Sequence, residues 1–148
     1  MLKRLWIRWL LALLGWTAVA LFFASQTYLS YKYSGGQASV WLVLKMNLIE
    51  WYVWGLLAPG IIWLARRFPL EQGHWGRSLA MHSVASVGVS LLKWTLNNLL
   101  RRYLLGFPRS MYLIYVFHQT FAIYWIVVAA TQGYRYYSRY REGELRTA

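Results

Sequence analysis

Apolar residues occur along this chain in long blocks separated by basic and turn-forming residues. Runs of about twenty apolar residues are typical of membrane-spanning helices, whereas the elements of soluble proteins alternate apolar with polar positions. The connections between the blocks are short, so neighbouring helices are expected to run antiparallel. The pattern therefore predicts an all-α, integral membrane four-helix antiparallel bundle. The predicted spans cover about residues 9–31, 40–64, 78–100 and 110–133.

The spans form one predicted four-transmembrane-helix domain, residues 1–134, followed by a basic tail, residues 135–148. No proline ends the fourth span, so the tail is expected to continue as a cytoplasmic helix or as the start of a signalling linker. Arg135, Arg139 and Arg141 are the tail residues expected to carry an output signal. A tail that lies on anionic lipid headgroups is the alternative.

The distribution of Lys and Arg predicts how the chain crosses the membrane. The formal net charge is +12, but the basic residues flank the apolar runs instead of forming one soluble face, so we expect no nucleic-acid partner. Ten of them lie at the amino end, in the middle connection and in the tail, against four in the other two connections. Cytoplasmic segments are enriched in basic residues, and both termini are therefore predicted to be cytoplasmic.

A polar cluster is predicted among the second, third and fourth spans. Charged side chains at membrane depth cost about 3 kcal/mol or more and by default face the bundle interior in pairs. At a rise of about 1.5 Å per residue, Glu50 lies roughly 15 Å and Lys93 about 10 Å below the same predicted surface, which makes them a candidate ion pair. His118, Asn47 and Asn97 fall in the same outer half. The cluster is interpreted as a structural pair that fixes helix register, as a site that senses a ligand or protons, or as part of a transport pathway.

The remaining polar residues predict no cofactor and no catalytic chemistry. His82 and His118 lie about 16 Å apart along the membrane normal, so they cannot ligate one haem iron, and His82 is expected to form an interhelical hydrogen bond. The chain has no Cys and no spacing typical of metal ligands, so no metal site is predicted. Phosphate-binding loops and nucleophile–base pairs are also absent. This chain is therefore not expected to be an enzyme.

Two smaller patterns predict local structure. The pair Gly35-Gly36 predicts a turn between the first and second spans. Small residues in the third span predict close approach of a neighbouring helix. These are Ala80, Ser83, Ser86 and Ser90.

Several motifs carry a resemblance to a known family. They are Trp51-Tyr-Val-Trp54, Ala58-Pro59, Leu64-Ala-Arg-Arg-Phe-Pro69, Trp75-Gly-Arg77, His82 and the ending Tyr140-Arg-Glu-Gly-Glu-Leu145. With these, nearly the whole chain resembles the N-terminal four-helix transmembrane sensor region of bacterial sensor histidine kinases that partner with LytTR-type response regulators. The ending resembles the start of that family's signalling helix.

The resemblance implies a sensory and dimerisation input module in the bacterial cytoplasmic membrane. Its implied partners are membrane lipids, a second copy of the chain, and a downstream kinase domain in the same polypeptide or a response regulator reached through it. The family's phosphoacceptor lies in a His-Phe-Leu-Phe-Asn type of motif, and His74, His82 and His118 all lack that context. Kinase activity therefore does not carry over to this chain.

Two other classes of function stay open at this point. One is a small oligomeric proton-coupled membrane transporter in which Glu50 loads and releases protons. The other is a structural membrane-protein subunit, which would co-purify with a fixed partner through detergent.

Overall fold

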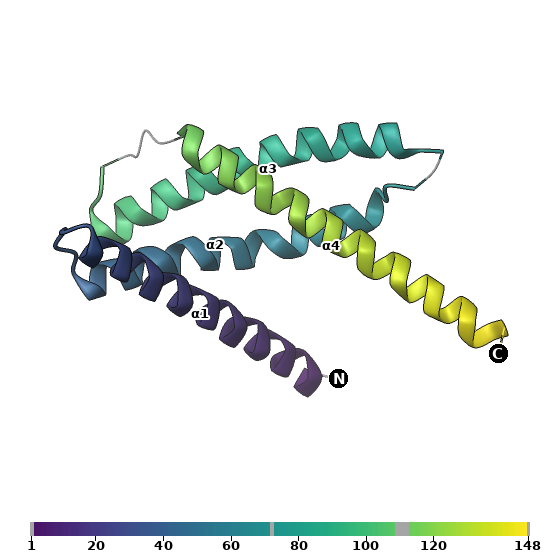
Figure 1. Ribbon diagram of the computed structural model, residues 1–148, viewed down its shortest axis with the longest axis horizontal. Helices are drawn as coiled ribbons and strands as arrows, with labels where there is room; N and C mark the ends of the chain where they lie inside the picture. Colours follow the sequence, from purple (N-terminus) through teal and green to yellow (C-terminus); the bar gives the residue numbers. More distant parts are fainter. Residues whose placement is uncertain (1, 72, 109–112, 148) are drawn as a thin grey trace. The chain divides into compact units, whose positions relative to one another are not determined.

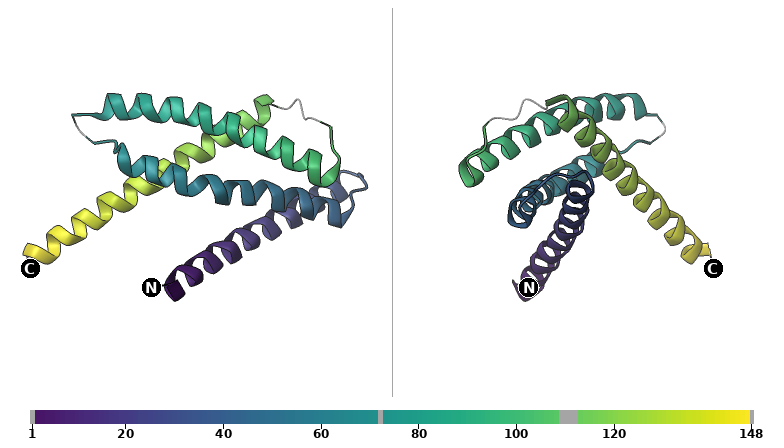
Figure 2. Two further views of the ribbon diagram at one scale, coloured as in Figure 1. Left: turned by 180° about the vertical axis from the view of Figure 1, so that it is seen from behind. Right: turned by 60° about the vertical axis from the view of Figure 1, so that its left-hand side comes forward.

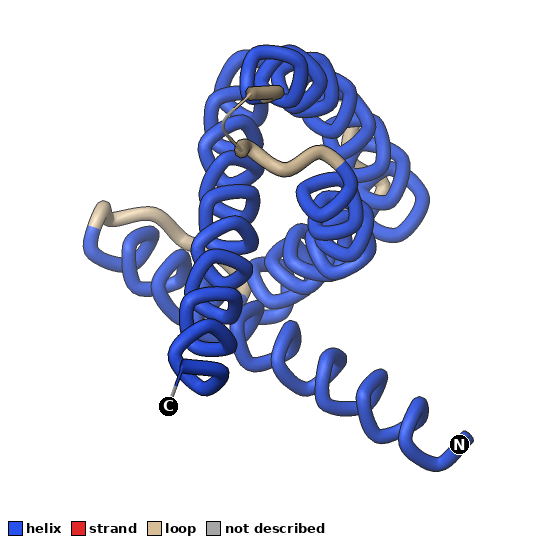
Figure 3. The backbone as a smooth tube through the Cα atoms, turned by 90° about the vertical axis from the view of Figure 1, so that its right-hand side faces the viewer, coloured by secondary structure: helices blue, strands red, loops and turns tan. Residues whose placement is uncertain are grey.

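The computed structural model describes residues 2–71, 73–108 and 113–147, and within them it contains four α-helices and no strand (Figures 1 and 3). The predicted all-α, four-helix fold is confirmed. The helices are longer than the predicted spans, because each one continues past its apolar run through helix-compatible Arg, Lys and Tyr residues. Their bounds are α1, Leu2–Tyr33; α2, Val40–Arg67; α3, Trp75–Leu105; and α4, Leu113–Thr147.

Three helices in the described part of the chain are long and apolar enough to cross a membrane: Arg4–Tyr33, Val40–Arg67 and Trp75–Leu105. They correspond to the first three predicted spans. The first residues of the predicted fourth span, 110–112, and the neighbouring Arg109 lie outside the described residues. The fourth span therefore stays a prediction.

Glycine and proline define the helix ends. After α1, the N–H groups of Gly35 and Gly36 donate to the carbonyls of Lys32 and Tyr31, at 3.3 and 3.0 Å, and Gly35 has a φ of 74°. This pattern is a Schellman C-cap, which needs a left-handed residue that glycine adopts without steric cost. The predicted Gly35-Gly36 turn is thus confirmed. Pro69 follows closely after α2, where it cannot continue the helix.

The chain divides into two compact units. The first comprises Met1–Leu56 and Thr95–Arg109, and the second comprises Leu57–Trp94 and Ser110–Ala148. Each unit therefore combines segments of different helices, since α2 and α3 contribute to both.

In the first unit, α1 packs against the first half of α2 near the turn that joins them (Figure 2). The ring of Trp51 stacks on Phe23, with centroids 4.5 Å apart, and lies 6.3 Å from the ring of Trp16. Beside the rings, the hydroxyls of Thr17 and Tyr52 are hydrogen-bonded at 2.8 Å. Stacked aromatic pairs each contribute about 0.5–1.5 kcal/mol beyond the area they bury.

In the second unit, α3 buries a polar stripe and exposes apolar side chains. Ser78, His82, Ser86, Ser90 and Lys93 are all at least 95% buried and follow one another at intervals of four, four, four and three residues. That spacing places them on one face of the helix. The exposed α3 residues of this unit include Leu79, Met81, Val84, Val87, Leu91 and Leu92. In a soluble amphipathic helix the apolar face is buried and the polar face is exposed, and here the distribution is reversed. It fits a helix whose outer face contacts lipid.

The small residues of α3 that predict close approach of a neighbouring helix differ in burial. Ser86 and Ser90 are buried, whereas Ala80 and Ser83 are exposed. The buried face is set by the four-residue interval from Ser78 through His82, which places Ala80 and Ser83 on other sides of the helix.

Replacing Gly55 by Leu is expected to destabilise the packing of α1 on α2. A Cβ atom at Gly55 would lie 3.1–3.2 Å from the indole ring of Trp16, so a larger side chain must displace that ring. Overpacking of this kind costs roughly 1–3 kcal/mol. The measurement is the thermal unfolding midpoint of the purified chain in detergent. Gly15→Leu is the matched control, because a Cβ atom there has no neighbour within 4 Å among the described residues. An equal drop in both variants would contradict the contact.

Candidate functional site

The first polar site surrounds Glu50 in the first unit. Asn97 Nδ2 donates a hydrogen bond to Glu50 Oε2 at 2.8 Å, and Arg101 Nη2 lies 3.5 Å from the same oxygen. The Glu50 side chain is 18% exposed and that of Arg101 is 29% exposed. The carboxylate on α2 therefore holds two side chains that lie one turn apart on α3.

Two atoms of this site lack hydrogen-bond partners among the residues that the structure describes. They are Asn97 Oδ1 and Arg101 Nε, both fully buried. A buried polar atom without a partner costs about 1–3 kcal/mol. Such atoms are uncommon in native proteins and mark places where a water, an ion or a change of packing supplies the missing bond.

The other predicted members of the polar cluster lie as follows. Asn47 Nδ2 donates to the carbonyl of Val43, at 2.9 Å, and so bonds within its own helix. Lys93 is fully buried and His118 is exposed, and both belong to the second unit. The pairing of Glu50 with Lys93 stays a prediction.

Arg101 is not among the predicted site residues, because the predicted third span ends at residue 100. The helix continues to Leu105, so Arg101 is still helical and lies four residues after Asn97 on the same face. That i, i+4 spacing is the signal in the sequence that relates the two residues.

The second polar site is centred on His82 in the second unit. His82 Nε2 lies 2.9 Å from the carbonyl oxygen of Phe68, and Nδ1 lies 2.8 Å from the hydroxyl of Tyr124. A carbonyl only accepts, so Nε2 carries the proton, and in a neutral ring Nδ1 accepts from the tyrosine. His82 and Tyr124 are both fully buried. One imidazole thus connects α3 to α4 and to the residue that follows α2.

A third set of contacts joins Gln132, Arg135 and Arg139 of α4 to the end of α2 and to Glu71. We call this set the α4 clasp. Gln132 Nε2 donates to the carbonyl of Ala65 at 2.7 Å, and Arg135 Nη1 donates to the carbonyl of Arg66 at 3.1 Å. The last carbonyls of a helix have no N–H donor within the helix. These two side chains of α4 supply hydrogen-bond donors to the last carbonyls of α2.

The α4 clasp continues into the connection between α2 and α3. Arg139 Nη1 lies 2.8 Å from Glu71 Oε1, and Arg135 Nη2 lies 3.9 Å from the same oxygen. Arg141, the third predicted output residue, is exposed. Two of the three tail arginines therefore join α4 to the connection, and Glu71 is the partner that the sequence did not indicate.

Metal binding finds no support in the described residues, because no group of three or more His, Cys, Asp or Glu side chains gathers there. Comparison with protein-family models, with curated proteins and with solved structures finds no match.

Tyr124→Phe is expected to lower the stability of the second unit by about 1–3 kcal/mol, because it leaves the buried Nδ1 of His82 without a donor. The control is Tyr134→Phe, which removes the same hydroxyl from a side chain of the same helix that is 69% exposed. Thermal unfolding in detergent measures both. If the two variants unfold at the same temperature as the parent chain, the hydrogen bond between α3 and α4 contributes nothing to stability.

Proposed function

We propose that this chain is the membrane-embedded sensory and dimerisation input module of a two-component sensor histidine kinase, without the catalytic domains. It would act in the bacterial cytoplasmic membrane with both termini in the cytoplasm. The observation that carries the proposal is the continuity of α4, which runs unbroken from Leu113 to Thr147. The helix includes most of the predicted fourth span and nearly all of the basic tail.

A continuous helix is a suitable element for signal output. At about 1.5 Å per residue, α4 is roughly 50 Å long, so a rotation or shift at one end reaches the other end. The α4 clasp holds this helix at two backbone carbonyls of α2 and at Glu71. A change in the packing of α2 would therefore change the position of the tail.

A stimulus must prefer one of two packings to have this effect, because a ligand shifts an equilibrium only by its difference in affinity for the two states. The Glu50 site is the candidate input. Asn97 Oδ1 and Arg101 Nε are buried and have no hydrogen-bond partner among the described residues. A second packing of the helices could give these atoms partners and would then be favoured by the added hydrogen bonds. Replacing Glu50 by Gln and Lys93 by Met in a full-length kinase would test this role, and unchanged signalling would exclude the polar cluster as the sensor.

The direct test of the proposal is the mass of the native polypeptide in its source cells, measured by immunoblot or intact mass spectrometry. A product much larger than the 17.5 kDa of this chain, with kinase domains after the tail, is the expected result. A native product of 17.5 kDa would reject an input module of a larger kinase. It would favour a proton-coupled transporter that uses Glu50, or a structural subunit.

Charge reversal in the α4 clasp is expected to change the output of the full-length kinase. Glu71→Arg removes an exposed ion pair worth roughly 0.2–1 kcal/mol, so autophosphorylation should change by at most about fivefold. Combining it with Arg139→Glu restores the opposite charges and should restore the parent activity. The control combines Glu71→Arg with Arg146→Glu, an exposed position of the same tail. Recovery in the control as well would show that net charge, and not this contact, sets the output.

A further inference from the structure

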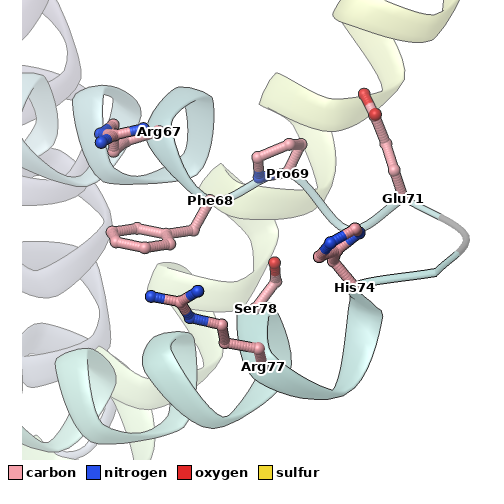
Figure 4. A pocket seen from close by; sticks show the side chains of 7 residues that line it. All are labelled: Arg67, Phe68, Pro69, Glu71, His74, Arg77 and Ser78. Atoms are coloured by element: carbon pink, nitrogen blue, oxygen red, sulfur yellow. The ribbon is translucent and has the colours of Figure 1, made fainter.

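The connection between α2 and α3 contains a pocket of about 320 Å³ in the second unit (Figure 4). Small-molecule sites in proteins begin at roughly this size. Its lining comes from the end of α2, the connection itself and the first turn of α3. It shares Phe68 with the His82 site and Glu71 with the α4 clasp, but its other lining residues belong to none of the three sites described above.

Three of the seven residues that line the pocket are basic. Arg67, Arg77 and His74 all lie on it and are exposed. Neither arginine has a carboxylate partner among the residues that the structure describes. Glu71 also lines the pocket, but its carboxylate is already paired with Arg139 and Arg135. The positive charge of the two lining arginines is therefore not neutralised by the protein.

A serine residue that is 5% exposed supplies the second observation. Ser78 is 5% exposed and lines the same pocket, and Figure 4 shows its side chain between Arg77 and Pro69. Its Oγ forms no hydrogen bond with any residue in the described part of the chain, although its backbone N–H donates to the carbonyl of His74. Ser78 lies in the first turn of α3, where the helix dipole is positive.

We propose that this pocket binds a phosphate-bearing anion, which is either the headgroup of an acidic phospholipid or free phosphate. Guanidinium groups bind phosphate oxygens through two parallel hydrogen bonds, and the Ser78 hydroxyl can donate a further one. The connection is predicted to lie at the cytoplasmic membrane surface, where acidic headgroups are abundant. The binding itself does not depend on the proposed sensory role.

The experiment titrates the full chain in detergent with phosphatidylglycerol and counts bound lipid by native mass spectrometry, with phosphatidylcholine as the headgroup control. Arg67→Gln combined with Arg77→Gln is expected to weaken phosphatidylglycerol binding about tenfold or more, because it removes two charged groups that hydrogen-bond phosphate oxygens. Arg4→Gln combined with Arg8→Gln removes the same charge from exposed positions of α1 and should change the affinity by less than about twofold.

Ser78→Ala keeps the charge and tests the pocket even if the double arginine variant fails to fold. It is expected to weaken binding about tenfold or more, since it removes one hydrogen bond to a charged group. Inorganic phosphate then distinguishes the source of the anion. Displacement of the lipid by millimolar phosphate identifies a site that free phosphate can occupy, and resistance to phosphate identifies a headgroup site. Equal loss in the two arginine doubles, or no loss with Ser78→Ala, overturns the proposal.

Discussion

The burial of polar groups away from lipid is the constraint on which the rest of this structure depends. Hydrocarbon offers no hydrogen bonds, so a polar side chain on a membrane helix must find its partner within the protein. On α3 the buried face is polar, from Ser78 through Lys93, and apolar residues such as Val84 and Leu91 are exposed. His82 finds its partners on Tyr124 of α4 and on the carbonyl of Phe68, which follows α2, whereas the hydroxyls of Ser86 and Ser90 donate to carbonyls of α3 itself.

Each unit meets the constraint with its own contacts. In the first unit, Glu50 of α2 accepts a hydrogen bond from Asn97 and forms an ion pair with Arg101. In the second, His82 bonds to Tyr124 of α4 and to the carbonyl of Phe68. The α4 clasp applies the same principle at the end of α2, where side chains of α4 satisfy backbone carbonyls that the helix cannot. Polar contacts thus join α2 to α3 in the first unit and α4 to α3 and to the end of α2 in the second, while stacked aromatic rings fill the contact between α1 and α2.

The helices could be predicted from the sequence because long apolar runs and glycine turns are local signals. The site could be predicted only in part. Membrane depth places Asn97 near Glu50, but the apolar run ends before Arg101, and the helix does not. Tyr124 carries no local signal, since a tyrosine in an apolar segment is compatible with a core, an interface or a lipid contact. Glu71 is separated from Arg139 by 68 residues, and only tertiary packing brings them together.

Accessibility along α3 tests the central claim that its polar face is covered by protein and its apolar face by lipid. The native chain has no Cys, so single cysteines at Val84, Ser86, Val87, Ser90 and Leu91 can each carry a spin label without background. In a reconstituted bilayer, collision with oxygen, which concentrates in the hydrocarbon, reports contact with lipid. The account predicts high oxygen accessibility at positions 84, 87 and 91 and low accessibility at 86 and 90. Equal accessibility at all five positions, or the opposite order, would contradict it.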